Sequence, residues 1–368
     1  MTTPLFEPTR IGAIAMSNRI VMAPMTRSRA DERDAPGDLH VAYYAQRAGA
    51  GLIVTEGTYP HACGKGYCRT PGIATQHQID AWRRVTDAVH RAHGRIVLQL
   101  MHVGRVASRL NKAPDADTVA PSALRANGTI HADGHGPVPM DVPRALARAE
   151  IPGVIDSFRQ AAVNALAAGF DGVELHASSG YLPMQFLLAG SNRRTDDYGG
   201  TPVRRARFTV ETLDAMAGAI GADRVGLRIC PGNPYNDMQD DDPALTYGTL
   251  LDAVSPLGLA YLHVSRSPDP RLDAFVLARR HFRGALIAND GFDARSAADL
   301  LAAGHADAVS FARHFIANPD LVSRLRHGAT LAAFDRATLY TPGARGFTDY
   351  PPLAGPDAGI PSMQRSSP

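Results

Sequence analysis

Several polar side chains follow a run of apolar residues near the middle of the chain. Residues 173–175 read as the end of a buried strand, and His176, Ser179 and Tyr181 come directly after it. An imidazole, a hydroxyl and a phenol can hold a substrate oxygen by hydrogen bonds or transfer a proton to the substrate. The pattern is therefore typical of a reactive site placed where a strand stops.

Short runs rich in β-branched residues alternate with amphipathic stretches along almost the whole chain. Eight runs are predicted to be strands: 19–27, 51–58, 95–102, 170–178, 224–230, 259–266, 284–290 and 307–313. Helical patterns lie between them, and a parallel strand needs such a crossover to return. Eight repeats of strand and helix predict an α/β fold of the (β/α)8, or TIM barrel, type. We expect residues 1–368 to form one such domain.

Three segments depart from this rhythm. Residues 6–18 are predicted to form an N-terminal hairpin that plugs the bottom of the barrel. Residues 111–146 form a long excursion rich in Gly, Pro and Asp after the third strand, and we expect it to cap the active site as a loop or subdomain. The Pro-rich C-terminal tail, 351–368, is expected to wrap the surface or fray.

In such a barrel, the reacting groups lie at the carboxyl ends of the strands. The residues expected there are Pro24, Thr26, Gly57, Gln99, His176, Tyr181 and Arg228. This set has neither the clustered His and Asp of a metal-dependent hydrolase nor the paired carboxylates of a glycosidase, so we expect no metal. A structural salt bridge is at least as good a use for Glu174 as catalysis.

A planar, electron-accepting ring with a phosphate tail fits these strand ends. Gln99 can offer both a donor and an acceptor to the ring edge, and Arg228 can hold negative charge that develops on the ring. The ends of the last two strands, 289–291 and 312–313, suit a phosphate, because a glycine, a helix N-terminus and an arginine lie there. The sequence has no GxGxxG after a strand and no GxxxxGK[ST], so a separate nucleotide-binding domain is not expected.

Composition narrows the class of protein further. The formal net charge of +2 is spread along the chain without a basic block, so neither nucleic acid nor a membrane surface is an expected partner. Three cysteines and the lack of a secretion-type leader favour the cytoplasm. We expect a small-molecule substrate and a monomer or a homodimer.

The motifs together resemble those of the Old Yellow Enzyme family of FMN-dependent ene-reductases, essentially from end to end. The resemblance is carried by RIVMAPMTRSRA, VLQLMHVGR, VAPSAL, FDGVELHASSGYLPMQFL with SNRRTDDYGG, DAVSFARHFIANPDLV and GFTDYP. It implies non-covalently bound FMN, a hydride taken from NADPH or NADH, and reduction of the C=C bond of activated alkenes such as enones, nitroalkenes and quinones.

The resemblance also implies roles for individual residues. The flavin ring would be lined by Pro24, Met25, Thr26, Gly57, Gln99, His176 and Arg228, and the phosphate would be held by Asp290, Gly291, Ala312 and Arg313. Thr26 would lie near the ring carbonyl beside the hydride-carrying nitrogen. His176 would bind the substrate oxygen, Tyr181 would protonate the α-carbon, and Tyr67 would face the substrate pocket.

The chain departs from the family pattern at three positions. It has Ser179 where the family usually has His or Asn, Met101 where Trp is common, and Phe347 where Tyr is frequent, the last two being expected in the substrate pocket. Serine has a shorter reach than His or Asn, and a lost oxyanion donor slows reactions markedly. We expect either slow reduction of simple enones or a substrate that brings its own polar group.

Two alternatives stay open at this point. One is an FMN enzyme of the same fold that acts as a desaturase, an isomerase or a nitro or nitrate-ester reductase. The other is a flavin-free barrel such as a lyase or a binding protein, which would need a lysine, a metal cluster or a carboxylate pair at the strand ends.

Overall fold

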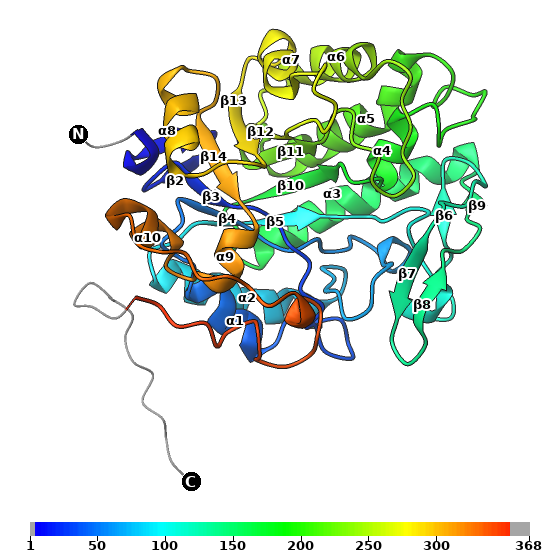
Figure 1. The fold of residues 1–368 in the computed structure, drawn as a ribbon. Helices are drawn as coiled ribbons and strands as arrows, with labels where there is room; N and C mark the ends of the chain where they lie inside the picture. The colour runs from blue at the N-terminus through cyan, green and yellow to red at the C-terminus, as the bar shows by residue number, and fades with distance from the viewer. Residues whose placement is uncertain (1–3, 354–368) are drawn as a thin grey trace.

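Eight parallel strands close into a barrel at the centre of the molecule (Figure 1). This computed structural model describes residues 4–353, so the tail predicted over 351–368 lies, from residue 354 on, outside the described residues. Around the barrel the order is β10-β11-β12-β13-β14-β3-β4-β5. The strands are β3 (Ile20–Met22), β4 (Leu52–Val54), β5 (Ile96–Leu100), β10 (Gly172–Ala177), β11 (Val225–Ile229), β12 (Tyr261–Ser265), β13 (Ala285–Asn289) and β14 (Ala308–Phe311). The predicted (β/α)8 barrel is confirmed.

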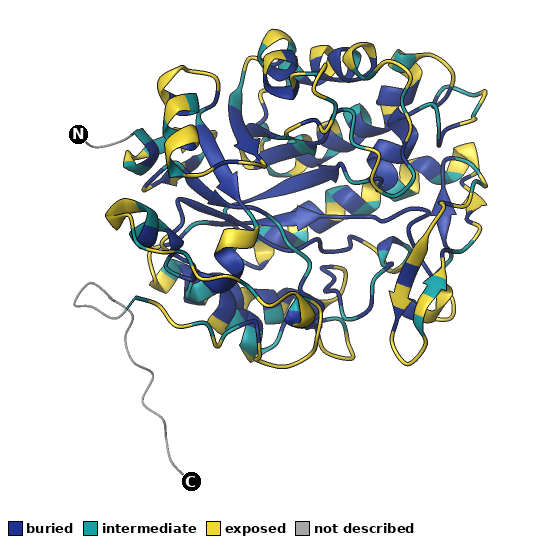
Figure 2. Ribbon diagram, viewed as in Figure 1, coloured by how far each residue is buried: buried dark blue, intermediate teal, exposed yellow. Residues whose placement is uncertain are grey.

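Helices surround the strands and turn their polar faces outward, as the burial colours show (Figure 2). The α-helices are α1 (Asp38–Ala45), α2 (Gln76–Arg91), α3 (Ile151–Ala167), α4 (Leu182–Leu187), α5 (Pro202–Ile220), α6 (Pro243–Val254), α7 (Ala274–His281), α8 (Ala294–Ala302), α9 (Arg313–Ala317) and α10 (Leu321–His327). Short 3-10 helices are η1 (Pro4–Phe6), η2 (Ala62–Gly64), η3 (Arg109–Asn111), η4 (Arg148–Glu150), η5 (Ala222–Arg224), η6 (Ser255–Leu257) and η7 (Arg336–Thr338). Several helices start at a side-chain cap; the Thr75 hydroxyl, for example, accepts from the Gln78 N–H at the start of α2.

The N-terminal hairpin closes the amino end of the barrel, as expected. It consists of β1 (Thr9–Ile11) and β2 (Ile14–Met16), which pair antiparallel. Its apolar side chains pack against the first residues of the barrel strands. Gly12 has φ of +54°, and a Cβ there would lie 2.2 Å from the carbonyl oxygen of Asp223, so glycine alone fits this turn.

The excursion after the third strand contains strands of its own. β6 (Val119–Ala120) pairs parallel with β9 (Arg144–Ala145), and β7 (Thr129–Ala132) forms an antiparallel hairpin with β8 (Gly136–Pro139). We call β7 and β8 with their turn the cap hairpin. Within residues 4–353, no helix is long and apolar enough to span a membrane.

Two buried arginines hold the last described part of the chain against the barrel. Arg27 Nη2 donates to the carbonyl of Gly346 at 2.7 Å, and Arg29 donates to the carbonyls of Thr338 and Gly343, both at 2.9 Å. These bonds satisfy backbone acceptors that an irregular segment would otherwise leave unpaired. Residues 336–347, here called the C-terminal strap, are thereby kept beside the carboxyl end of the barrel.

Candidate active site

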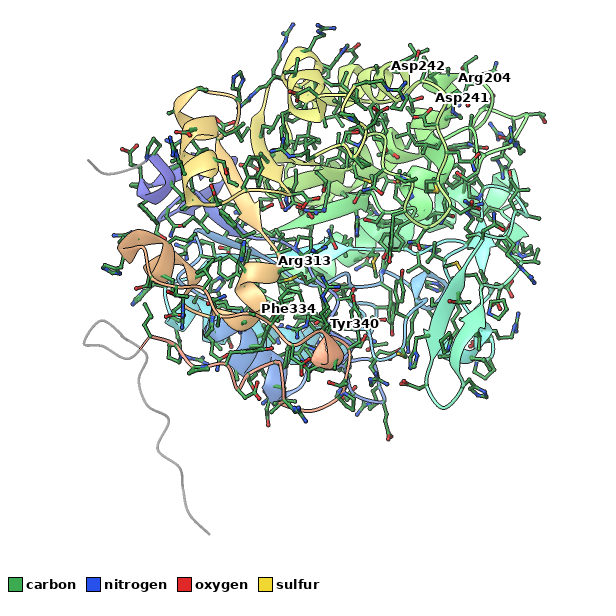
Figure 3. All side chains as sticks on the ribbon, viewed as in Figure 1. Arg204, Asp241, Asp242, Arg313, Phe334 and Tyr340 are labelled. Carbon is green, nitrogen blue, oxygen red and sulfur yellow. The ribbon has the colours of Figure 1, made fainter. Side chains whose placement is uncertain are left out.

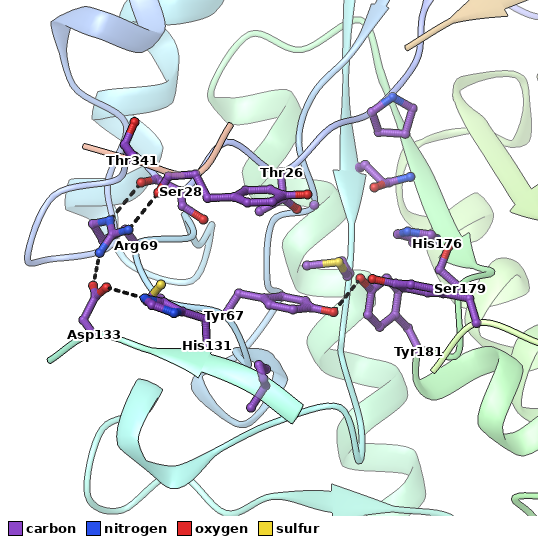
Figure 4. Close-up of a pocket in the computed structure, with 18 of the residues that line it drawn as sticks. Thr26, Ser28, Tyr67, Arg69, His131, Asp133, His176, Ser179, Tyr181 and Thr341 are labelled. Atoms are coloured by element: carbon purple, nitrogen blue, oxygen red, sulfur yellow. Dashed lines mark hydrogen bonds and ion pairs between the residues drawn. The ribbon is translucent and has the colours of Figure 1, made fainter. Parts of the chain in front are cut away.

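A cavity of about 730 Å³ opens at the carboxyl end of the barrel (Figure 4). Its floor comes from the ends of β3, β4, β5 and β10, and its walls come from the cap hairpin, the 67–69 loop, Tyr235 and the C-terminal strap. Of the residues predicted from the sequence, the cavity is lined by Pro24, Thr26, Gly57, Tyr67, Gln99, Met101, His176, Ser179 and Tyr181. The structure therefore brings most of the predicted floor and substrate-pocket residues into one cavity.

A tight turn after β10 places His176 and Tyr181 next to each other. Ser179 and Gly180 have φ of +57° and +78°, and a Cβ at Gly180 would lie 2.7 Å from the Cβ of Asn236. The left-handed pair reverses the chain before α4 begins. The rings of His176 and Tyr181 then meet edge to face, with their centroids 4.8 Å apart.

Tyr181 is a protonated phenol whose hydroxyl has one hydrogen-bond partner among the described residues. Burial raises its pKa well above the ordinary range, and the neighbouring Tyr67 raises it further. The hydroxyl groups of Tyr181 and Tyr67 lie 3.1 Å apart and share a hydrogen bond (Figure 4). Tyr181 can therefore deliver a proton into the cavity, with Tyr67 in contact with the oxygen that loses it.

His176 is neutral, and a hydrogen-bonding partner lies on the side of its ring away from the cavity. Burial, helped by the positive charge of Arg228, lowers its pKa to about 3. Its Nδ1 lies 3.0 Å from the Ser178 hydroxyl. Ser179 is also in the cavity wall, but its hydroxyl has no hydrogen-bond partner among the described residues; its N–H instead donates to Cys230 Sγ.

Beneath the cavity floor, the barrel interior holds a polar network, only part of which is evident from the sequence. The Gln99 amide donates to Glu174 Oε1 at 2.8 Å, and His263 Nδ1 lies 2.8 Å from Glu174 Oε2. Burial opposes ionisation of Glu174, but His263 and Arg228 hold its pKa below the ordinary value. Burial and the positive charge of Arg228 lower the pKa of His263 to about 4, so this histidine is neutral. Glu174 is thus a buried carboxylate that binds neighbouring side chains. This agrees with the structural role expected for it from the sequence.

Arg228 supplies the positive charge of this network. It sits on β11 in register with His176 on β10. Its Nη2 donates to Asn289 Oδ1 at 2.7 Å, and its Nη1 lies 2.7 Å from His263 Nε2. The predicted cation is therefore directly beside the predicted oxygen-binding histidine, although the Arg228 side chain does not itself line the cavity. His263 went unnoticed in the sequence because it lies inside an apolar strand run.

The residues predicted to hold a phosphate lie apart from the cavity lining, at the ends of β13 and β14. Asp290 and Gly291 have φ of +81° and +76°, and both are exposed. Arg313 is exposed at the start of α9 (Figure 3). Within the described chain, the backbone N–H groups of Gly291, Ala312 and Arg313 find no acceptor. An unusual backbone with free N–H groups is the arrangement expected of an anion site.

Two predicted positions are placed elsewhere. Phe347, expected in the substrate pocket, is fully buried; its ring stacks on Tyr43 with centroids 4.1 Å apart, and the Arg29 guanidinium lies 4.5 Å from its ring centre. Stacking and cation–π attraction therefore make Phe347 part of the strap anchor, and Tyr340 of the strap lines the cavity instead. Met25, expected at the flavin, is half-buried against the hydrophobic core and is not in the cavity wall.

The outer wall of the cavity carries three polar residues that no sequence motif marks as a site. Cys68, His131 and Asp133 bring a thiol, an imidazole and a carboxylate within 4.8 Å of one another. Arg69 forms an ion pair with Asp133 and also donates to the carbonyl of Ser28 (Figure 4). The guanidinium already balances this carboxylate and repels a further cation, so we interpret the group as a link between the cap hairpin and the 67–69 loop.

The chain matches the NADH:flavin oxidoreductase / NADH oxidase family over residues 4–332. It is 41% identical over 353 residues to a probable flavin mononucleotide-dependent alkene reductase of Leishmania infantum, covering 94% of this chain and 97% of that protein. It is 39% identical over 382 residues to 12-oxophytodienoate reductase 7 of Oryza sativa subsp. japonica, covering 96% and 95%.

Solved structures agree with these relatives. Morphinone reductase in complex with tetrahydroNAD superimposes with a TM-score of 0.91 at 44% identity, covering 96% of this chain and 98% of that one. The old yellow enzyme homologue from Zymomonas mobilis gives a TM-score of 0.91 at 38% identity, covering 95% and 99%. The chain therefore belongs to the Old Yellow Enzyme family of NADH:flavin oxidoreductases, as its motifs predicted.

Proposed function

We propose that the protein is an FMN-dependent oxidoreductase that takes a hydride from NADPH or NADH and reduces the C=C bond of activated alkenes. The observation that carries the proposal is the placement of a neutral histidine and a protonated phenol side by side over one cavity floor. Names of the relatives support the class of reaction, since they include an alkene reductase and a 12-oxophytodienoate reductase.

The residues present fit FMN. Gln99 Oε1 and the Thr26 hydroxyl have no partner among the described residues, and both belong to the cavity lining. The free N–H groups at 291 and 312–313 would hold the phosphate, and Arg228 would favour negative charge on the ring. Bound FMN would supply the relay of hydride from the nicotinamide to the alkene.

The side chains over the floor would act on the substrate. The Nε2–H of His176 would donate to the carbonyl or nitro oxygen and stabilise it as negative charge develops there. Tyr181 would give its proton to the α-carbon, and Tyr67 would donate to the phenolate that remains. The Ser179 hydroxyl would be a second, shorter donor to the same oxygen.

We also propose a setting for this activity. The three cysteines are free, which supports a reducing compartment such as the cytoplasm. The cavity is large enough for a small-molecule substrate beside the flavin. A monomer or a homodimer is consistent with a site built from one chain.

Purified protein tests the proposal directly. It should be yellow and should release FMN when it is denatured. Anaerobic addition of NADPH or NADH should bleach the colour, and a panel of enones, nitroalkenes and quinones should restore it. A colourless protein that ignores added FMN in a binding titration would exclude the proposed function.

A further inference from the structure

The hydroxyl group of Ser178 is buried directly behind the histidine of the cavity. Ser178 is 1% exposed, and its Oγ lies 3.0 Å from His176 Nδ1. Ser178 does not line the cavity, whereas His176 does. The hydroxyl can therefore act on a substrate only through the imidazole.

A neutral imidazole carries one N–H, and its position decides what the ring offers to the cavity. With the proton on Nε2, the ring donates a hydrogen bond into the cavity; with the proton on Nδ1, the ring presents only a lone pair there. Ser178 can accept from Nδ1–H or donate to a bare Nδ1. The direction of this single hydrogen bond therefore selects the form of His176.

The surroundings of Ser178 favour donation to His176. A competing acceptor for the Ser178 proton is the Cys230 thiol, which accepts the N–H of Ser179 at 3.1 Å and lies 3.8 Å from Met184 Sδ. Burial raises the pKa of Cys230 to about 11, so a neutral thiol, which is a weak acceptor, stands there. Nδ1 of His176, at 3.0 Å from the Ser178 Oγ, is the better acceptor and is favoured over the thiol for the Ser178 proton.

We infer that Ser178 is a positioning residue that holds His176 in the form protonated on Nε2, and that this presents a hydrogen-bond donor to the substrate oxygen. The inference deepens the proposed function and, for its catalytic consequence, rests on it. It adds the Ser178 hydroxyl to the groups that the reaction needs. The cavity-lining residues do not reveal this, because Ser178 is buried behind the imidazole ring.

Nitrogen NMR on the FMN-loaded enzyme tests the inference without any turnover. In protein labelled with ¹⁵N-histidine, two-bond proton–nitrogen spectra report which ring nitrogen carries the proton, and a His176→Asn spectrum identifies the His176 signals. We expect a protonated Nε2 and a bare Nδ1 in the wild type. A protonated Nδ1 would overturn the inference, and this measurement needs no Ser178 variant to fold.

A Ser178→Ala variant separates positioning from packing. We expect its His176 signals to shift toward a mixture of the two forms and its reoxidation by an enone to slow about fivefold, the loss of one net hydrogen bond. Ser191→Ala is the matched control, since Ser191 is equally buried and its Oγ donates to the carbonyl of Gln185 at 2.8 Å, away from His176. Unchanged His176 signals in Ser178→Ala, or the same shift in Ser191→Ala, would contradict the inference. If instead the wild-type spectrum is as expected but no alkene is reduced, the result would count against the proposed function alone.

Discussion

The two ends of the barrel are built from the same strands but have opposite chemistry. At the amino end, Ile11, Ile14 and Met16 of the hairpin pack against apolar strand residues, and all three are at most 2% exposed. At the carboxyl end, the strands finish in side chains with hydrogen-bonding groups directed into a cavity. The difference teaches that stability and reactivity are separated along the barrel axis. Substitutions at the amino end should therefore lower stability, and substitutions at the carboxyl end should lower reaction rates.

The largest expected effect lies at the carboxyl end. Tyr181→Phe removes the proposed proton donor, and a positioned general acid contributes a hundredfold to ten-thousandfold in rate, so reoxidation by an enone should slow about a thousandfold, or about 4 kcal/mol. Stopped-flow absorbance measures this rate. Reduction of the flavin by NADPH or NADH, which needs no phenol proton, is the internal control and should keep its wild-type rate. If flavin reduction collapses and alkene turnover by pre-reduced enzyme survives, the role given to Tyr181 is wrong.

The amino end should show the opposite response. Ile14→Ala removes a buried side chain from the plug, and such truncations lower the free energy of unfolding by about 3 kcal/mol. Urea unfolding monitored by fluorescence measures the change, and both half-reactions should stay at wild-type rates. Val203→Ala, at a position 70% exposed on α5, is the control and should change stability by less than about 0.5 kcal/mol. If Ile14→Ala had normal stability and poor turnover, stability and reactivity would not be separated between the two ends of the barrel.

A gain rather than a loss is expected at Ser179. Ser179→Asn places a longer donor in the cavity, and asparagine tolerates the left-handed backbone found there, with φ of +57°. A full oxyanion donor is worth roughly a hundredfold, so imperfect geometry should still speed reoxidation by 2-cyclohexenone about tenfold. Ser179→Ala serves as the comparison. Fast wild-type turnover with no gain in the Asn variant would show that serine, alone or through a bound water, is already an adequate donor.

The smallest expected effect is that of pH. The lowered pKa of His176, about 3, keeps its ring neutral above pH 5, and the raised pKa of Tyr181 keeps the phenol protonated through pH 9. Both groups therefore hold the required form throughout this range, and the enone half-reaction should vary less than about twofold between pH 5.5 and 8.5. A rate that falls with an apparent pKa near 6.5 would mean that His176 titrates as an exposed histidine does.

Much of the fold could be predicted because its signals are local. β-Branched runs and amphipathic stretches mark the strands and helices, and residues 6–18 read as a hairpin before any contact is known. The cap hairpin could not be predicted in the same way. Gly134, Gly136 and two prolines interrupt its alternation, and its apolar residues Ile130 and Val138 pack with residues distant in the sequence.

The placement of residues at the cavity could be predicted where it depends on position along a strand, and not where it depends on contacts between strands. His176 and Gln99 follow from the rule that strand ends carry the chemistry. His263 looks like one polar residue in an apolar run until barrel closure sets it between Glu174 and Arg228. Phe347 was misplaced for a related reason, because the two arginines that draw the strap inward lie near the other end of the sequence.

Pairing of the last barrel strand with the first has a consequence for folding during synthesis. Val309 on β14 lies opposite Ile20 on β3, so the sheet cannot close until the chain through β14 has left the ribosome. At ordinary rates of translation that delay is on the order of tens of seconds. During it, the growing sheet has open edges that can pair with other chains. The strap follows β14 in the chain and can complete the cavity wall only after closure, so a nascent chain that stalls before residue 336 would hold a barrel without a finished site.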